Sequence, residues 1–245
     1  MLGGLSAVCW TMGAGSAVRR VVPDQSTRLL LTGLLFAGTG SLMAISPWGR
    51  RSGAHLNPVV TLAFWIQGKV HVHDVAGYVI AQLLGAVTGT AAVLALWGPT
   101  AQTLHVGATQ PGRGFDDLAA TGLEAVMTAA LMLMILLLTS SARTARWTPI
   151  GNLALVAALV WQCAPYTGTS LNPARSLGPA LLAPLLAHIW VYLVGPTAGS
   201  LLACGAFALV RDRHTLTAKL FHDAAYRSTL GSELPVAAAS TDSHR

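Results

Sequence analysis

Two stretches with the pattern Gly-x-x-Leu-Asn-Pro constrain the fold of this sequence more than any other feature. The first begins at Gly53 and the second at Gly168, and the second continues into Arg175, in strongly apolar sequence without a nearby acidic residue. A charge in a membrane segment costs at least roughly 2.5–3.5 kcal/mol, so such an arginine either faces a water-filled cavity or extends from a helix end to the lipid headgroups. Two matching stretches about half a chain apart favour the cavity, because they indicate two structural repeats that meet at one site.

The composition places the chain in a membrane. It has 245 residues, of which 53% are apolar and only 10% are charged, whereas an average soluble domain has roughly 25% charged residues. The net charge of +6 does not indicate a nucleic-acid partner, because the sequence lacks a basic stripe with interleaved aromatic residues. No metal site is expected either, because the three cysteines lie in separate apolar segments without the spacing of metal ligands: Cys9, Cys163 and Cys204.

The apolar segments predict six transmembrane helices, at about 2–18, 29–48, 75–97, 118–140, 148–163 and 188–210. The first has about 17 residues, which is the short limit for a span, and we interpret it as a helix truncated at its N-terminus. Two shorter apolar runs, 59–66 and one ending at residue 186, follow the Asn-Pro pairs. Each is too short to cross a bilayer and is expected to be a re-entrant half-helix. The predicted fold is therefore an all-α membrane protein.

The basic residues predict the side of the membrane that each loop faces. Six spans place both termini on the same side, and cytoplasmic loops carry an excess of Lys and Arg. The loops after the second and fourth spans and the C-terminal tail hold most of these residues, which places both termini in the cytoplasm. The two halves then have opposite orientations, so the Asn-Pro pairs enter the membrane from opposite faces as an inverted repeat. The cytoplasmic set is Arg50, Arg51, Lys69, Arg143, Arg146, Arg211, Arg213, Lys219, Arg227 and Arg245, against Arg19, Arg20, Arg28 and Arg113 opposite.

The Asn-Pro pairs predict where the half-helices begin. Proline is favoured at the first helical position and asparagine can cap a helix start, so Asn57 and Asn172 each begin a half-helix. Two such starts that meet near the midplane aim positive dipole ends and two amide groups at the same point. That point repels cations, offers donors to the oxygen of a passing neutral molecule and interrupts a water wire that relays protons. The residues before each asparagine, 53–55 and 168–170, are expected to be unwound and to line a cavity.

These stretches resemble the two signature loops of the major intrinsic protein family, the aquaporins and glycerol facilitators. The resemblance covers almost all of 2–210 and includes 52–58, 172–180 and the sixth span at 190–196. It implies an hourglass-shaped aquaporin fold, a homotetramer with one pore in each subunit, and passive transport without a cofactor. The pattern at 163–170 is more similar to the nodulin-like branch and its bacterial relatives, which include channels for water, glycerol, and boric or arsenious acid. The pore motifs are then Asn57, Pro58 and Val59 in the first loop and Asn172, Pro173 and Ala174 in the second.

The resemblance also implies a selectivity filter of four side chains, which a gapless count places at Ala37, Val160, Thr169 and Arg175. A one-residue slip in the second span would substitute Phe36 for Ala37. Water-specific members carry an aromatic residue and a histidine in this filter, and we expect neither here. A small, apolar-sided constriction with one guanidinium is expected to be wider and to admit polyols or small uncharged acids.

Two positions depart from the family pattern. Val59 stands where the family usually has alanine, and its added methyl groups either press on the pore or, in the interpretation that we favour, repack the tip of the half-helix. Ser176 follows Arg175, where glycerol facilitators resemble Asn-Pro-Ala-Arg-Asp. The second departure argues against a glycerol facilitator in the strict sense.

Two further residues are expected to support the pore loops. Glu124 matches a family glutamate that hydrogen-bonds the half-helix loop of its own repeat, and His55 has a family counterpart beside the pore. The sister glutamate of the first span would fall just before Met1. The resemblance therefore predicts either that the sequence begins too late or that the first repeat is degenerate.

The sequence thus predicts a channel domain at 1–210, with repeat one at about 1–97 and repeat two at about 118–210, and a disordered cytoplasmic tail at 211–245. The expected function is a passive channel for water and small uncharged solutes in the bilayer of the plasma or inner cell membrane. The alternative is a non-conducting structural or degenerate protein that keeps the fold. An enzyme is not expected, because the sequence contains no nucleophile with a base partner and no phosphate-binding loop. Glycines at four-residue spacing predict close contacts between the third and sixth spans: Gly85, Gly89, Gly195 and Gly199.

Overall fold

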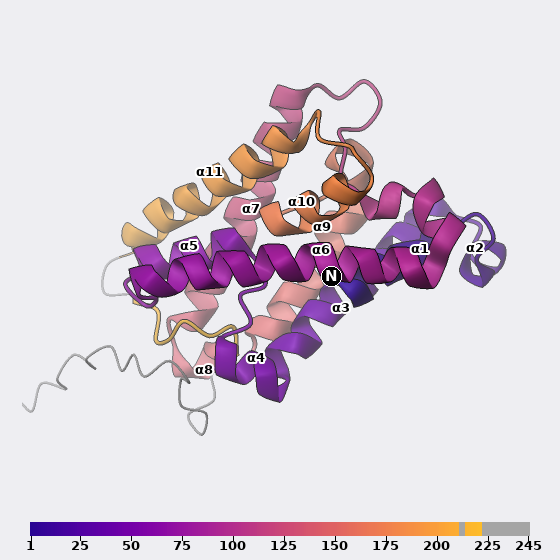
Figure 1. Cartoon of the computed structure of the whole chain (residues 1–245). Coiled ribbons are helices and arrows are strands. Elements are labelled where there is room, and N and C mark those ends of the chain that lie inside the picture. Colours follow the sequence, from indigo (N-terminus) through magenta and orange to yellow (C-terminus); the bar gives the residue numbers. More distant parts are fainter. Residues whose placement is uncertain (211–213, 222–245) are drawn as a thin grey trace, which may run out of the picture.

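Helices account for all regular secondary structure in residues 1–210 and 214–221, the part of the chain that the computed structural model describes (Figure 1). This confirms the all-α prediction. Five of the helices are long and apolar enough to cross a membrane, and a shorter apolar helix precedes them. The five are α3 (Gln25–Ile45), α6 (Val72–Thr103), α7 (Asp117–Thr139), α9 (Thr148–Thr167) and α11 (Ile189–Ala208).

The sequence predicted one helix over 2–18, but the first apolar segment forms two helices. Helix α1 (Leu2–Met12) ends before Gly13, and a separate short helix α2 (Ala17–Val21) follows. Glycine favours the break because it loses more backbone entropy in a helix than other residues do. Ser16 then begins α2, since its side-chain oxygen accepts a hydrogen bond from the backbone N–H of Arg19 at 3.1 Å.

Local capping also sets the ends of the long helices. Helix α3 begins four residues earlier than position 29 because the Asp24 carboxylate accepts hydrogen bonds from the backbone N–H and hydroxyl of Thr27, both at 2.6 Å. These two hydrogen bonds lower the pKa of the Asp24 carboxyl, and the bond from the Thr27 hydroxyl has the larger effect. Helix α6 passes the predicted end at residue 97 through a kink at Gly98, which has a φ of 44°, and a single 3₁₀ turn follows at His105–Gly107.

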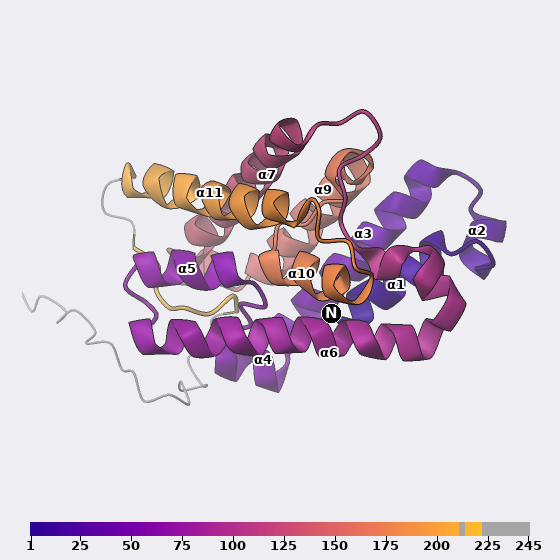
Figure 2. The same ribbon diagram turned by 45° about the horizontal axis from the view of Figure 1, so that its top comes forward.

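Two half-helices occupy the centre of the molecule. Helix α5 (Pro58–Ile66) and helix α10 (Pro173–Leu182) lie in a row between α6 and α11 (Figure 2). Helix α10 ends four residues before the predicted position 186, because Pro184 cannot continue a helix. The remaining short helices, α4 (Pro47–Ser52) and α8 (Ala142–Ala145), connect the longer ones.

Each half-helix packs against the last long helix of the opposite repeat. Helix α10 contacts α6, where the Gly178 position lies so close to Ala86 that an added Cβ would meet its backbone at 2.8 Å. Helix α5 contacts α11, and the Ser200 hydroxyl of α11 donates to the Val59 carbonyl at 2.9 Å. This packing of each half-helix against the opposite repeat ties the two repeats together.

The small residues of α11 face α7 rather than α6, so the predicted glycine contact between the third and sixth spans is wrong. An added Cβ at Gly195 would meet the Thr121 carbonyl at 2.8 Å, and one at Gly199 would overlap the Ala125 carbonyl. Helices α7 and α11 belong to the same repeat. Their glycines therefore allow close packing within a repeat, while the repeats join through α3 against α9 and through the half-helices.

Part of the segment that the sequence assigned to a disordered tail makes defined contacts. Thr215 and Leu220 are buried, and the Leu216 N–H donates to the carbonyl of Thr139 at the end of α7, at 2.9 Å. Residues 214–221 run from there towards the loop before α5. The rest of the predicted tail, at 211–213 and 222–245, lies outside the described residues.

Candidate functional site: two facing half-helix caps

The two asparagines cap the half-helices with the same geometry. The side-chain oxygen of Asn57 accepts from the Val59 N–H at 3.1 Å, and that of Asn172 accepts from the N–H groups of Ala174 and Arg175 at 3.0 and 3.3 Å. Pro58 and Pro173 occupy the first helical position of each helix, where no N–H is needed. The Asn-Pro pairs therefore start both half-helices where the sequence predicted.

The same asparagines also join the two loops to each other. The Asn57 amide nitrogen donates to the carbonyl of Leu171, and the Asn172 amide nitrogen donates to the carbonyl of Leu56, each at 2.8 Å. Each asparagine thus holds the residue that precedes its counterpart. An amide nitrogen carries two hydrogens, so one N–H on each asparagine remains for another acceptor.

The backbone of the two loops is strained at matching positions. In the first loop Gly53, Ala54 and Leu56 have φ values of 84°, 54° and 53°. In the second loop Gly168, Thr169 and Leu171 have φ values of 74°, 48° and 57°. A non-glycine residue in this region costs of order 1–3 kcal/mol and persists only where the surroundings enforce it, which is typical of functional sites. The reciprocal asparagine bonds are part of that enforcement.

Glu124 of α7 holds the second loop. Its side chain is fully buried. One carboxylate oxygen accepts from the Thr167 hydroxyl and the Ser170 N–H, both at 2.8 Å, and the other accepts from the Leu171 N–H at 2.9 Å. The structure thus places Glu124 against the loop of its own repeat. The carboxylate lies behind that loop, and Glu124 is not among the described residues that line the cavity.

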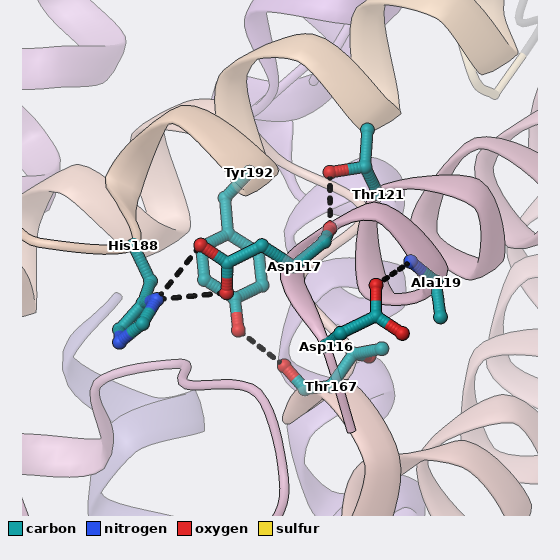
Figure 3. A network of polar contacts seen from close by, with 7 residues as sticks. All are labelled: Asp116, Asp117, Ala119, Thr121, Thr167, His188 and Tyr192. Atoms are coloured by element: carbon teal, nitrogen blue, oxygen red, sulfur yellow. Dashed lines mark hydrogen bonds and ion pairs between the residues drawn. The ribbon is translucent and has the colours of Figure 1, made fainter. Parts of the chain in front are cut away.

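A second contact behind the same loop comes from α11. Figure 3 shows Tyr192 reaching Thr167, and the tyrosine hydroxyl donates to the Thr167 carbonyl at 2.8 Å. One turn earlier, His188 contacts the Asp117 carboxylate at the start of α7, with the closer oxygen 2.8 Å from Nδ1. The N-terminal ends of α7 and α11 are therefore joined to each other, one turn from the tyrosine that binds Thr167.

The Tyr192 contact leads to a testable expectation. Tyr192→Phe leaves the buried Thr167 carbonyl without its donor, and we expect a loss of about 1–2 kcal/mol in the free energy of unfolding. Thermal unfolding in detergent measures the change. Tyr166→Phe is the matched control, because Tyr166 is half-exposed and is expected to tolerate the change. Equal stability of wild type and Tyr192→Phe would contradict a supporting role.

Arg175 is held by a loop that the sequence did not connect with it. One guanidinium nitrogen donates to the Gly107 carbonyl at 2.8 Å, and the guanidinium carbon lies 5.3 Å from the centre of the Phe36 ring. The side chain is only 6% exposed, and its Nε has no partner among the described residues. Because this nitrogen itself has almost no exposed surface, any donation to a molecule in the cavity comes from the terminal guanidinium nitrogens.

Ser176 connects the second pore loop to the loop before α7. Its hydroxyl lies 2.6 Å from that of Thr109 and 2.5 Å from that of Ser170. Either hydroxyl of each pair can donate. The departure from the glycerol-facilitator pattern at Ser176 therefore fits a chain of short hydroxyl contacts instead of a carboxylate.

His55 is fixed in one orientation at the first loop. Its ring is stacked between those of Phe64 and Tyr78, with centroids 5.1 and 4.7 Å away. Nε2 lies 2.7 Å from the Ala218 carbonyl and Nδ1 lies 3.0 Å from the Thr61 hydroxyl. A carbonyl can only accept, so Nε2 carries the proton and Nδ1 accepts from Thr61.

A cavity of about 460 Å³ runs past both asparagines. Arg175, His55, Phe36 and Ala37 line it, whereas Val160 and Thr169 are buried outside the described part of its wall. The structure thus brings together two of the four predicted filter residues and adds Phe36. Val60 faces the cavity while Val59 is buried away from it, which agrees with repacking of the half-helix tip. Other polar wall residues are Thr39, Ser52, Gln82, Asn152, Ser170 and Tyr78.

The electrostatics of this cavity disfavour cations. Two half-helix N-termini and the Arg175 guanidinium direct positive charge towards it, and the described wall contains no Asp or Glu. Cations are therefore repelled. Small molecules with hydroxyl or carbonyl oxygens find amide and guanidinium donors among the apolar side chains of the wall.

Sequence reasoning missed three supports of the site: Gly107, Thr109 and Tyr192. Gly107 and Thr109 lie in a segment that the sequence indicates only as a polar connecting loop. Tyr192 lies in an apolar span. No local pattern marks them, because each contacts a residue at least 25 positions away in the sequence. In the structure, His105, Val106 and Gly107 have positive φ angles, and this loop shape brings the Gly107 carbonyl to Arg175.

Comparison with known proteins agrees with this geometry. The family model described as "Major intrinsic protein" matches residues 1–207. The chain is 35% identical over 182 residues to glycerol uptake facilitator protein-like 6 of Lactiplantibacillus plantarum, which covers 71% of this chain and 82% of that protein. It is 33% identical over 180 residues to aquaporin NIP1-3 of Oryza sativa subsp. japonica, and the aligned region covers 71% of this chain and 60% of that protein.

A solved structure has the same fold. The aquaglyceroporin of Plasmodium falciparum superposes with a TM-score of 0.64 at 23% identity, over 84% of this chain and 88% of that one. At this level of identity the likeness concerns the arrangement of helices. Together with the family match over nearly the whole described chain, it shows that this protein belongs to the major intrinsic protein family.

Proposed function

We propose that this protein is a passive membrane channel for water and small uncharged solutes. The observation that carries the proposal is the reciprocal pair of asparagine bonds, which fixes two positive helix ends and two free amide N–H groups on one cavity. Such a site needs no bound cofactor and no catalytic residue. It works by offering hydrogen bonds to neutral molecules while repelling cations.

The solute range follows from the wall around Arg175. We assign the selectivity filter to Arg175, Ala37 and Phe36, which line the cavity, and not to Val160 and Thr169, which lie outside its described wall. The ring of Phe36 faces the guanidinium and supplies an aromatic face that the sequence did not predict. An aromatic face beside a guanidinium suits a molecule with one apolar edge and one hydroxylated edge. Glycerol and other polyols, and boric or arsenious acid, have small neutral shapes with such hydroxyl groups. The name of the Lactiplantibacillus relative, a glycerol uptake facilitator-like protein, supports the same class of solute.

The proposal includes the setting of the channel. The excess of Lys and Arg in alternate loops supports cytoplasmic termini in a multi-pass protein of the plasma or inner cell membrane. Repeat one at about 1–97 and repeat two at about 118–210 form the channel domain. Four copies form a homotetramer with a pore in each subunit, as the family resemblance implies.

Reconstituted vesicles test the proposal. Wild-type protein in liposomes is expected to pass water, glycerol or boric acid faster than empty vesicles do in stopped-flow light scattering. Arg175→Ala removes the guanidinium and widens the filter, so passage of larger polyols is expected to rise relative to water. If no neutral solute crosses faster than in empty vesicles, the protein is a non-conducting member of the family and the channel proposal fails.

A further inference from the structure

Residues 214–221, here named the C-terminal strap, cross the face of the protein that carries the first pore loop. The strap begins beside α7, where Leu216 N–H donates to the Thr139 carbonyl at 2.9 Å. Thr215 is buried at this point. The strap then crosses to the loop at residues 50–55, so its two ends are fixed on different helices.

Two backbone groups of the strap bind the first pore loop. His55 Nε2 donates to the Ala218 carbonyl at 2.7 Å, and the Leu220 N–H donates to the Gly53 carbonyl at 3.1 Å. These bonds resemble the addition of an extended peptide to an existing backbone, in which main-chain groups supply the contacts.

The pore loop has the shape that such a peptide needs. A Cβ at position 53 would lie 2.5 Å from the Ala218 carbonyl oxygen, so only glycine allows the strap to approach this closely. His55 presents its Nε2 donor because Phe64, Tyr78 and Thr61 fix the ring. The binding groups are therefore oriented by contacts that do not involve the strap.

Apolar side chains of the strap complete its attachment. Leu220 is 8% exposed, belongs to the same buried cluster as Phe64 and Val70, and lines the cavity together with Leu56. The next residue, Phe221, lies with its ring centre 4.9 Å from the guanidinium carbon of Arg50. The strap thus contributes a side chain to the wall of the proposed solute path.

We propose that the mouth of the cavity at Gly53 and His55 is a peptide-binding site, that its occupant is the strap of the same chain, and that the bound strap restricts solute entry. This inference rests on the channel function proposed above. Release of the strap removes Leu220 from the cavity wall and uncovers His55. The channel then has a closed or narrowed state with the strap bound and a wider state without it.

Two deletions test the proposal in proteoliposomes. Removal of 214–245 takes away the strap and is expected to raise glycerol or water flux per channel; if the bound state outnumbers the free state ten to one, the rise is about tenfold. Removal of 222–245 alone is the matched control, because it leaves every strap contact described above in place, and its flux is expected to equal that of the full chain. Equal flux in all three proteins would overturn the strap proposal while leaving the channel function intact.

Point variants decide the matter if the longer deletion fails to fold. Phe221→Ala weakens the attachment to Arg50, and Leu220→Asp introduces a charge that disfavours burial in the cavity wall. Both are expected to raise flux, and a synthetic peptide of residues 211–222 is expected to lower it again in the longer deletion when added from one side only. Unchanged or lower flux in correctly folded Phe221→Ala and Leu220→Asp would refute the proposal. Absence of flux in every protein would instead refute the channel function.

Discussion

Glu124→Ala is expected to lower the free energy of unfolding by about 3–5 kcal/mol and to abolish solute flux. The carboxylate accepts the Thr167 hydroxyl and the N–H groups of Ser170 and Leu171. Hydrogen bonds to a charged group contribute about 1.5–3 kcal/mol each, and donors left unpaired in a buried site add a desolvation cost. The second pore loop also carries three residues with positive φ. Without Glu124 this strained loop loses the contacts that hold it.

Thr128→Val is the matched control for Glu124→Ala. Thr128 lies one turn further along α7 and is equally buried, but its hydroxyl has no partner within the described chain. Its replacement by valine is expected to leave thermal unfolding and flux unchanged or to raise stability slightly. Glu124→Gln is expected to fall between wild type and alanine, because one oxygen is kept. If Glu124→Ala unfolds at the wild-type temperature, the carboxylate is not the support of the loop.

Asn172→Ala is expected to reduce flux at least tenfold and stability by about 1–3 kcal/mol. Loss of a helix cap costs about 0.5–2 kcal/mol, and loss of the hydrogen bond to the carbonyl of the half-exposed Leu56 costs about 0.5–1.5 kcal/mol more. The substitution also removes one of the two amide groups on the cavity. Stopped-flow flux and thermal unfolding measure the two effects.

Asn152→Ala separates this role from the mere presence of an asparagine on the wall. Asn152 of α9 also lines the cavity, but within the described part of the chain its amide donates only to the Ser41 hydroxyl, at 3.3 Å, and it caps no half-helix. We expect a change in flux of less than twofold for Asn152→Ala, because it removes neither a half-helix cap nor a bond between the two pore loops. Comparable losses in the two variants would show that the reciprocal pair has no special role.

The sequence predicted the parts of the fold that depend on local chemistry. An asparagine followed by Pro58 or Pro173 predicts the start of each half-helix, and the long apolar runs predict the membrane spans. The break at Gly13 was missed because an apolar run of suitable length suggested one continuous helix. The contacts of the strap were missed because a polar stretch without periodicity gives no sign of backbone hydrogen bonds to a distant loop.

In the candidate site, too, some residues could be predicted from local sequence and others could not. Its motif residues follow from sequence because the cap and the proline act on their own neighbours. The partner of Arg175 does not follow, since Gly107 acts through a carbonyl that any residue has, and only the fold of its loop brings it near. The uncertainty between Phe36 and Ala37 is resolved in part: both line the cavity, and Phe36 faces the guanidinium.

The two pore loops are equivalent in backbone shape but have different supports. The second loop rests on the Glu124 carboxylate within the membrane domain. The first loop binds the strap through the Gly53 carbonyl and His55. A fixed support on one side and an exchangeable segment on the other would allow one mouth of the channel to change while the centre stays constant.

The central claim is that solute passes through the cavity between the two asparagines. The most direct test places a cysteine at Leu56, which lines this cavity and is 47% exposed, and a control cysteine at Leu96, which is exposed on α6 outside the described cavity wall. A bulky thiol reagent is expected to block most glycerol flux in Leu56→Cys and none in Leu96→Cys or wild type. Full modification of Leu56→Cys, shown by mass spectrometry, with unchanged flux would contradict the claim.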